Sequence, residues 1–288
     1  MFDLLYGLNE EQKQAVTAGD GPLLIIAGAG SGKTKVLVTR CAYLLSERSV
    51  WPGSILAVTF TNKAAREMRE RLELLTGIDV QRMWLGTFHS VCARILRMEA
   101  DFCSFGTNYV IWDDSDQQSM LKGIIADMGL DDKKHSPRAM SSYISDCKNS
   151  MLLPADAAAE AESPYEQNAA KVYTTYERQK QNNNALDFDD LIMQTVLLFR
   201  REPAVLSRYK EKFRYIFVDE YQDTNHSQYL LVKLLAGENG NLCVVGDPDQ
   251  SIYSWRGADI SNILDFEKDY PTAQKIMLVQ NYRSTQNI

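Results

Sequence analysis

Residue types that mark particular protein classes are scarce in this chain of 288 residues. Its five cysteines, at positions 41, 92, 103, 147 and 243, are scattered and form no CxxC pair. This pattern argues against a structural zinc site and favours reduced thiols in a cytoplasmic protein. No apolar run approaches the roughly 20 residues that a helix needs to cross a bilayer. The first residues, MFDLLYGLNEEQ, show no basic stretch followed by an apolar one. We therefore expect neither a signal peptide nor a membrane partner.

The charge balance is acidic, with a formal net charge of −7, but it is unevenly distributed. Basic residues gather in 63–71 and 200–214, and acidic residues gather in 113–116 and 156–162. Because the local field depends on nearby charges, a basic surface for nucleic acid remains compatible with this total. The composition, 45% hydrophobic and 24% charged, is that of a globular protein. The length allows two domains, or one domain with a large insertion.

Short apolar runs alternate with helical patterns in residues 1–88 and return in 213–280. PLLIIAG at 22–28 and ILAVTF at 55–60 are each followed by a helix-like stretch, and further runs follow at 215–220, 241–247 and 276–281. Strands that alternate with helices predict a parallel α/β sheet flanked by helices. Between them, in 89–212, helical periodicity replaces the strand signal. We therefore predict a discontinuous α/β core interrupted by a mostly helical insertion.

A glycine-rich segment, AGAGSGKT, directly follows the first apolar run and opens a helical pattern. A phosphate-binding loop requires this context, because glycines let backbone N–H groups approach phosphates and a helix N-terminus favours negative charge. Lys33 is expected to reach the β- and γ-phosphates, and the Thr34 hydroxyl to bind Mg²⁺. One position departs from GxxxxGK[ST], because Ala27 replaces the usual first glycine. The predicted nucleotide-contacting loop residues are Ala27, Gly28, Ala29, Gly30, Ser31, Gly32, Lys33 and Thr34.

Two carboxylates follow a later apolar run, in IFVDEYQD at 216–223. Open α/β sheets bind ligands at the carboxyl ends of their strands, where Asp219 and Glu220 are expected to lie. Asp219 suits the coordination shell of Mg²⁺, and Glu220 suits polarising an attacking water. With the phosphate loop, this pair predicts NTP hydrolysis or, more broadly, phosphoryl transfer.

Eight motifs in order resemble those of the superfamily 1 DNA helicases of the UvrD/Rep/PcrA group, from about residue 8 to the last residue. The resemblance implies a P-loop NTPase fold of the RecA-like type, with a mostly helical inserted subdomain, and ATP with Mg²⁺ as cofactors. The motifs are LNEEQ (8–12), AGAGSGKT (27–34), TFTNKAA (59–65), GTFHS (86–90), LDFDDL (186–191), VDEYQD (218–223), VGDPDQSIYSWRGA (245–258) and NYRS (281–284).

The resemblance assigns further residues to the nucleotide. Gln12 resembles the glutamine that reads the adenine edge, which an amide can do with a donor and an acceptor. Tyr282 resembles the ring that stacks on the adenine. Arg283 resembles the arginine that reaches the γ-phosphate and stabilises developing charge. Gln250 is expected to sense the γ-phosphate or its attacking water.

The resemblance also implies contacts with single-stranded DNA. Aromatic rings stack on bases without sequence preference, which suits Tyr253 and Trp255. Either ring could instead fold back as a plug of its loop, and His89 could be a helix-start residue that packs against its neighbours. The LDFDDL block is more simply explained as core, with Leu186, Phe188 and Leu191 buried. The expected DNA contacts are Phe60, Thr61, Asn62, Lys63, His89, Tyr253 and Trp255.

The resemblance implies an ATP-dependent DNA helicase that moves 3′ to 5′ on single-stranded DNA and acts at single-strand/duplex junctions. The expected division is a core at 1–88 and 213–280, an insertion at 89–212, and at 281–288 the start of a hinge to a second RecA-like domain. Without that domain we expect no unwinding. The helicase part of a recombination helicase–nuclease, a non-motor DNA-binding module and a phosphotransferase remain as alternatives.

Overall fold

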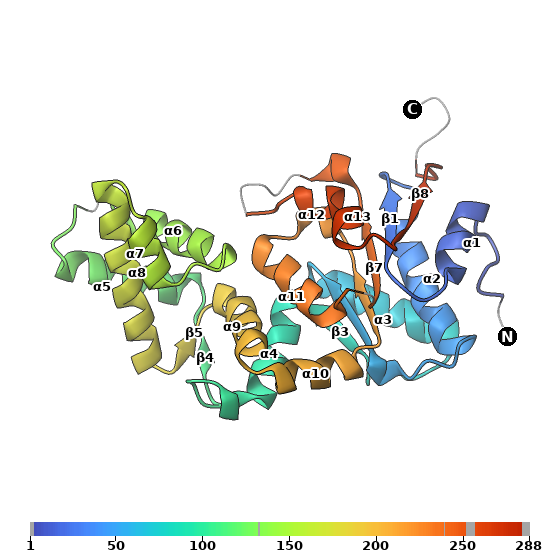
Figure 1. Cartoon of the computed structure of the whole chain (residues 1–288), viewed down its shortest axis with the longest axis horizontal. Helices are drawn as coiled ribbons and strands as arrows, with labels where there is room; N and C mark the ends of the chain where they lie inside the picture. Colours follow the sequence, from blue (N-terminus) through green and yellow to red (C-terminus); the bar gives the residue numbers. More distant parts are fainter. Residues whose placement is uncertain (1–2, 132, 239, 252–256, 284–288) are drawn as a thin grey trace. The chain divides into compact units, whose positions relative to one another are not determined.

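The computed structural model describes residues 3–131, 133–238, 240–251 and 257–283. The chain forms two compact units (Figure 1). The first unit comprises residues 1–91, 203–224 and 232–288, and the second comprises 92–202 and 225–231. Each is described separately below.

The first unit is built on a six-stranded sheet with the order β3-β2-β6-β7-β1-β8, in which every pairing is parallel. This confirms the predicted α/β fold with a helical insertion. β3 was not predicted, because it is four residues long and contains Gly86. The strands are β1 (Leu23–Ala27), β2 (Ile55–Thr59), β3 (Trp84–Thr87), β6 (Tyr215–Val218), β7 (Asn241–Gly246) and β8 (Gln274–Leu278).

Helices cover this sheet, as a parallel sheet requires, because its strands are apolar on both faces. Alternate strand residues such as Ile25 and Phe217 join one core with α1, α2 and α3. Figure 1 shows α1 and α2 on one side of β1, with α12 and α13 on the other. The helices are α1 (Glu10–Thr17), α2 (Lys33–Ser46), α3 (Asn62–Thr76), α10 (Pro203–Lys212), α12 (Ser261–Leu264) and α13 (Phe266–Asp269), while α4 (Phe88–Met98) and α11 (His226–Ala236) include residues of both units.

The helix α10 belongs to the first unit, although the sequence places it at the end of the helical insertion. Its Tyr209 ring meets the Trp84 ring at 6.2 Å, and Phe213 meets Trp84 at 5.1 Å, both edge to face. The Lys212 ammonium lies 4.5 Å from the centre of the same indole. These contacts attach α10 to β3.

Short 3-10 turns complete the element set, at η1 (Pro52–Ser54), η2 (Ala100–Phe102), η3 (Tyr221–Asp223) and η4 (Pro248–Gln250).

The second unit is mainly helical, as predicted, with one two-stranded parallel sheet. Several of its helices begin at side-chain caps that satisfy free backbone N–H groups, among them Asp113, Ser136, Ser163 and Asp187. The elements are α5 (Asp114–Asp127), α6 (Pro137–Asn149), α7 (Pro154–Glu160), α8 (Pro164–Asn182), α9 (Phe188–Arg201), β4 (Val110–Ile111) and β5 (Ala185–Leu186).

A buried ionic cluster joins α6, α8 and α9 in the second unit. Lys148 Nζ lies 2.5 Å from Asp187 Oδ2 and 2.8 Å from both Asp190 Oδ1 and Glu177 Oε1. Lys180 Nζ pairs with Asp190 as well and reaches Glu177 Oε1 at 2.6 Å. Two ammonium groups lie among the three carboxylates and offset two of their three negative charges, so ion pairs hold the cluster together.

The LDFDDL segment only partly fits the expected core. Leu186 and Leu191 are buried, and two of its aspartates join the ionic cluster. Phe188, however, is 46% exposed at the first position of α9, so its assignment to the core was wrong. The apolar pattern of the sequence could not show that Phe188, at the start of the helix, is exposed while Leu191, one turn later, is buried.

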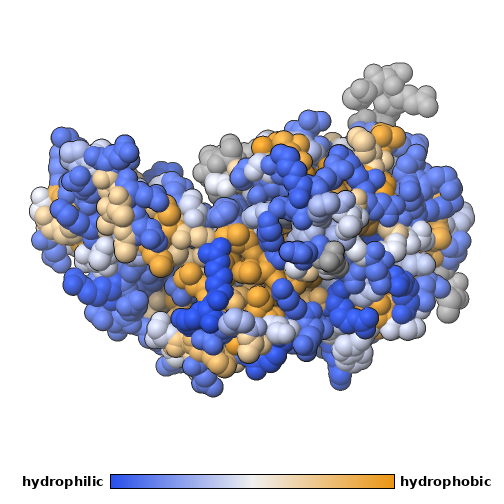
Figure 2. Space-filling view, in the orientation of Figure 1, coloured by the Kyte–Doolittle hydropathy of each residue, from blue (hydrophilic) through white to orange (hydrophobic). Residues whose placement is uncertain are grey.

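The surfaces of both units are mainly hydrophilic on the face shown in Figure 2. Among the helices that the structure describes, none combines the length and apolar character needed to span a membrane.

Candidate nucleotide-binding site

The predicted phosphate loop lies between β1 and α2, at the carboxyl edge of the sheet. Gly30 and Gly32 have φ angles of +74° and +89°, which side chains disfavour, so glycine permits this turn. Gly32 is the N-cap of α2 and, having no side chain, makes no cap hydrogen bond to the first N–H groups of the helix. Such N–H groups form an anion-binding site. The local geometry thus suits phosphate.

Ala27, where the loop pattern usually has glycine, is the last residue of β1 and fully buried. It is not among the residues with positive φ. Its methyl group packs in the core shared by the sheet and α2. Because neither conformation nor space demands glycine here, the departure from the pattern leaves the loop intact.

Gln12 on α1 holds the phosphate loop by a hydrogen bond. It is buried on α1, and its Nε2 donates to the carbonyl of Ser31 at 2.9 Å. Its Oε1 accepts from the N–H of Asn9 at 3.1 Å, within a capping box that starts the helix. An amide nitrogen carries a second hydrogen, so one donor remains for a ligand. The predicted reading of adenine by Gln12 stays a prediction.

Lys33 and Glu220 meet across the site. Lys33, the first residue of α2, donates from Nζ to Glu220 Oε2 at 3.0 Å. Glu220 follows β6 with φ 49° and ψ 45°, a left-handed conformation that is uncommon outside glycine. Strain of this kind gathers at functional sites, where surrounding structure must hold it. Here the conformation accompanies a carboxylate held at Lys33.

Asp219 lies beside this pair with only 6% of its surface exposed. Burial, followed by the neighbouring charge of Glu220, raises the pKa of Asp219 to about 6. Its Oδ1 accepts the N–H of Glu220 at 3.0 Å. Two adjacent carboxylates, one of them desolvated, suit a divalent cation. Its positive charge would offset both the desolvation of Asp219 and the repulsion between the two carboxylates. Thr34, half-buried at the second position of α2, supplies the hydroxyl that such a site uses.

Gln222 is a site residue that sequence reasoning missed. Its side chain is 1% exposed, and its Nε2 donates to Glu220 Oε2 at 2.9 Å. Its Oε1 accepts the N–H of Asp247 at 3.0 Å, at the end of the neighbouring strand β7. One amide therefore joins the carboxylate after β6 to the loop after β7. The only sequence signal was a polar residue inside VDEYQD.

Gln250 lies on the η4 turn that follows β7. Its Nε2 donates to Oδ2 of Asp247, which is buried. Since β7 lies between β6 and β1 in the sheet, this turn shares the edge that carries Glu220 and the phosphate loop. The structure thus collects the predicted hydrolytic groups on one edge.

The segment 281–283 crosses the phosphate loop. The Tyr282 N–H donates to the Gly30 carbonyl at 2.9 Å, and Asn281 Nδ2 donates to the Ala29 carbonyl at 2.8 Å. The Tyr282 ring is 53% exposed, and the Arg283 side chain is also exposed. Tyr282 and Arg283 therefore lie next to the phosphate loop, with exposed side chains.

The candidate DNA contacts of the TFTNKAA motif surround the start of α3. Thr61 caps this helix by accepting the Ala64 N–H at 3.1 Å, so its hydroxyl also has a structural purpose. Asn62 and Lys63 follow, both exposed, and Lys63 is within 3.9 Å of Glu67. The Phe60 ring packs edge to face on Phe88 at 5.8 Å. The contact of these residues with DNA stays a prediction.

His89 is half-buried as the second residue of α4, and burial lowers its pKa. Burial therefore favours the neutral ring, and the contact of His89 with DNA stays a prediction. Tyr253 and Trp255, together with Ile252 and Arg256, lie outside the described residues.

Comparison with known proteins identifies the family. Residues 8–271 match the family described as UvrD/REP helicase N-terminal domain. The chain belongs to this family. It is 57% identical over all 288 residues to the ATP-dependent DNA helicase PcrA of Staphylococcus aureus strain Mu50. It is 56% identical to the protein of the same description from Staphylococcus epidermidis strain RP62A. The chain spans 40% of the length of each of these relatives.

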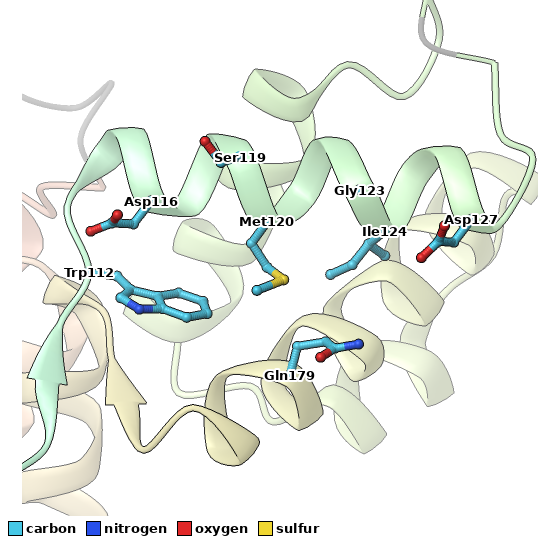
Figure 3. Close-up of a pocket in the computed structure, with 8 residues that line it drawn as sticks. All are labelled: Trp112, Asp116, Ser119, Met120, Gly123, Ile124, Asp127 and Gln179. Atoms are coloured by element: carbon cyan, nitrogen blue, oxygen red, sulfur yellow. The ribbon is translucent and has the colours of Figure 1, made fainter.

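A separate cavity of about 410 Å³ opens in the second unit, between α5 and α8 (Figure 3). Trp112, Met120 and Ile124 form its apolar surface, and Asp116, Asp127 and Gln179 add polar groups. None of the residues predicted to bind nucleotide or DNA lines it. It therefore contributes nothing to the candidate site of this UvrD/REP-type domain.

Proposed function

We propose that this chain is the ATP-binding portion of a DNA helicase that couples ATP hydrolysis to 3′ to 5′ movement along single-stranded DNA. The central observation is the meeting of Lys33 and Glu220 at 3.0 Å, with Asp219 beside them. The relatives from Staphylococcus are described as ATP-dependent DNA helicases, which supports the same activity here.

In the proposed reaction, the N–H groups at the start of α2 bind the phosphates of ATP, and Lys33 exchanges Glu220 for a phosphate oxygen. Thr34 and Asp219 would hold Mg²⁺, which when bound would neutralise phosphate charge. Glu220, released from the lysine, orients and deprotonates the attacking water. Gln222 keeps this carboxylate in place.

The remaining nucleotide contacts come from both ends of the chain. Gln12 reads the adenine edge, and the Tyr282 ring stacks on the base. Arg283 and Gln250 contact the γ-phosphate, where positive and polar groups stabilise the charge that develops during transfer. A second RecA-like domain, following a hinge that starts at 281–288, completes the cleft.

The DNA contacts are proposed on the same unit. Phe60, Tyr253 and Trp255 offer rings to bases, and stacking contributes roughly 1–3 kcal/mol per base. Thr61, Asn62, Lys63 and His89 approach the strand backbone. The functional division that we propose is an ATP-binding core at 1–88 and 213–280 and an insertion at 89–212, except that α10 packs with the core. Movement toward a single-strand/duplex junction then separates the strands.

A steady-state ATPase assay of the full-length protein, with and without oligo(dT), tests this function. We expect Mg²⁺-dependent hydrolysis that single-stranded DNA stimulates at least several-fold. Stimulation by a small metabolite in place of DNA would support a phosphotransferase, and DNA binding without turnover would support a non-motor module. The 288-residue chain alone is expected to bind nucleotide and DNA weakly and to unwind no duplex.

A further inference from the structure

The backbone carbonyl groups of residues 28–31 in the phosphate loop all accept hydrogen bonds. The Gly28 carbonyl accepts both the N–H and the hydroxyl of Ser31, at 3.2 and 2.7 Å. The next three carbonyls accept from residues outside the loop. They are Ala29 from Asn281, Gly30 from Tyr282 and Ser31 from Gln12. With these carbonyls bonded, the loop is held in a shape that can present its other N–H groups to an anion.

Two distant parts of the chain provide these donors. Gln12 comes from α1, near the start of the chain, and is fixed by its capping box with Asn9. Asn281 lies 252 residues from Ala29. Asn9 Nδ2 also approaches Gln280 Oε1, at 3.5 Å, and Gln280 Oε1 accepts the Tyr282 hydroxyl at 2.9 Å. The two parts therefore brace the loop and contact each other.

Asn281, like Gln12, acts both as a donor and as an acceptor through one side-chain amide. Nδ2 donates to the loop, while Oδ1 accepts the N–H of Arg283 at 2.8 Å. The segment can approach only because Gly30 has no side chain. A Cβ there would lie 2.6 Å from Arg283 Cβ and 2.8 Å from Asn281 Oδ1. One amide thus attaches the segment and shapes its turn.

We propose that Asn281 is a positioning residue that fastens 281–283 onto the phosphate loop and thereby maintains the loop shape required for phosphate binding. The proposal rests on the phosphate-binding role proposed above. Asn281 contacts no nucleotide in this account. It acts through the Ala29 carbonyl on the loop and through the backbone N–H of Arg283.

Hydrogen exchange of the loop amides at 28–32 and the affinity for a fluorescent ATP analogue with Mg²⁺ together test this role in the 288-residue chain. Asn281→Ala removes both bonds, and Asn281→Asp keeps the acceptor for Arg283 but loses the donor to Ala29. A matched control is Asn183→Ala in the second unit. Asn183 likewise donates from Nδ2 to a backbone carbonyl, that of Gln179, at 2.7 Å.

We expect Asn281→Ala and Asn281→Asp to speed exchange at 28–32 and to weaken analogue binding about threefold to tenfold, as expected for one lost hydrogen bond. Asn183→Ala should change neither. Loop exchange and affinity equal to those of the unaltered chain in both Asn281 variants would overturn the proposal. So would unaltered exchange in Asn281→Asp alone, because the Ala29 bond would then be dispensable. If the unaltered chain bound no ATP analogue while exchange still rose, the positioning role would stand and the proposed function would fail.

Discussion

Lys33 Nζ donates to Glu220 Oε2 at 3.0 Å, although 187 residues separate them in the sequence. Each group neutralises the charge that the other needs for its proposed task. The lysine is 11% exposed and the glutamate 37% exposed, so the pair is open to an entering ligand. ATP would replace the carboxylate at the lysine with a phosphate. Binding of ATP would therefore also release Glu220, the proposed base, from Lys33.

Glu220→Gln in the full-length protein separates these two events. The amide fills the same space but cannot take a proton from water, so we expect hydrolysis to slow by about 10²–10⁴-fold. Equilibrium binding of ATP should be retained, because Lys33 and the loop are unchanged. Lys33→Ala is the informative comparison, since it should weaken ATP binding as well. Turnover near the unaltered rate in Glu220→Gln would remove Glu220 from the mechanism.

Gln222→Glu tests whether the amide bridge positions Glu220. The variant keeps an oxygen for the Asp247 N–H but replaces the donor to Glu220 with a carboxylate. Because a second carboxylate disfavours the ionised form of its neighbour, the acid limb of the pH–rate profile should move to higher pH. Gln222→Leu removes the bridge without charge and should lower kcat with little effect on the limb. Identical pH profiles in all three proteins would assign Gln222 to packing alone.

Asp219→Asn should stabilise the metal-free chain. The folded-state pKa of Asp219 is raised to about 6, above its ordinary value of 3.8, so the folded state binds the proton more tightly than the unfolded one. The ionised carboxylate of Asp219 therefore lowers the free energy of unfolding. This destabilisation is absent below about pH 4 and is complete above about pH 6. Two pKa units correspond to at most about 3 kcal/mol.

Urea unfolding in chelator at about pH 7.5 and about pH 4 measures this effect. Asp219→Asn should exceed the unaltered chain in stability at the higher pH, and the gap should close at the lower one. Asp101→Asn, an exposed aspartate, serves as the control. A gap that is independent of pH would show that desolvated charge is not its cause.

Lys148→Met should destabilise the second unit. The ammonium of Lys148 contacts Asp187, Asp190 and Glu177, and its removal leaves buried carboxylates with one cation fewer. Breaking a buried ion network from one side typically costs about 3–5 kcal/mol. Thermal unfolding should show the loss, whereas Lys122→Met on the exposed face of α5 should stay within about 0.5 kcal/mol. Equal stabilities of the two variants would contradict a structural role for the cluster.

Most of the sheet could be predicted from the sequence because parallel strands buried on both faces are continuous apolar runs. β1, β2, β6 and β7 are such runs, each closed by turn formers or carboxylates. β3 escaped because Trp84–Thr87 is short and mixes an indole, a glycine and a threonine. Its strand identity comes from pairing with β2, which is a long-range property.

The phosphate loop was likewise predictable, since its glycines, lysine and threonine act through local backbone geometry and lie in one stretch. The sequence also placed Asp219 and Glu220 at a strand end. Their consequences needed tertiary structure: the pKa of Asp219 depends on burial by segments that no local pattern specifies.

The sequence by itself determined the α/β class, the phosphate loop and the ordered motifs that indicate a helicase, because each is encoded by residues close together in the chain. Only the tertiary structure decided which side chains meet. It joined Lys33 to Glu220, gave Gln222 and Asn281 their bonds, and exposed Phe188. Hydrogen bonds and ion pairs act over about 3 Å, so contacts across some 200 residues follow from packing of the whole unit and not from spacing.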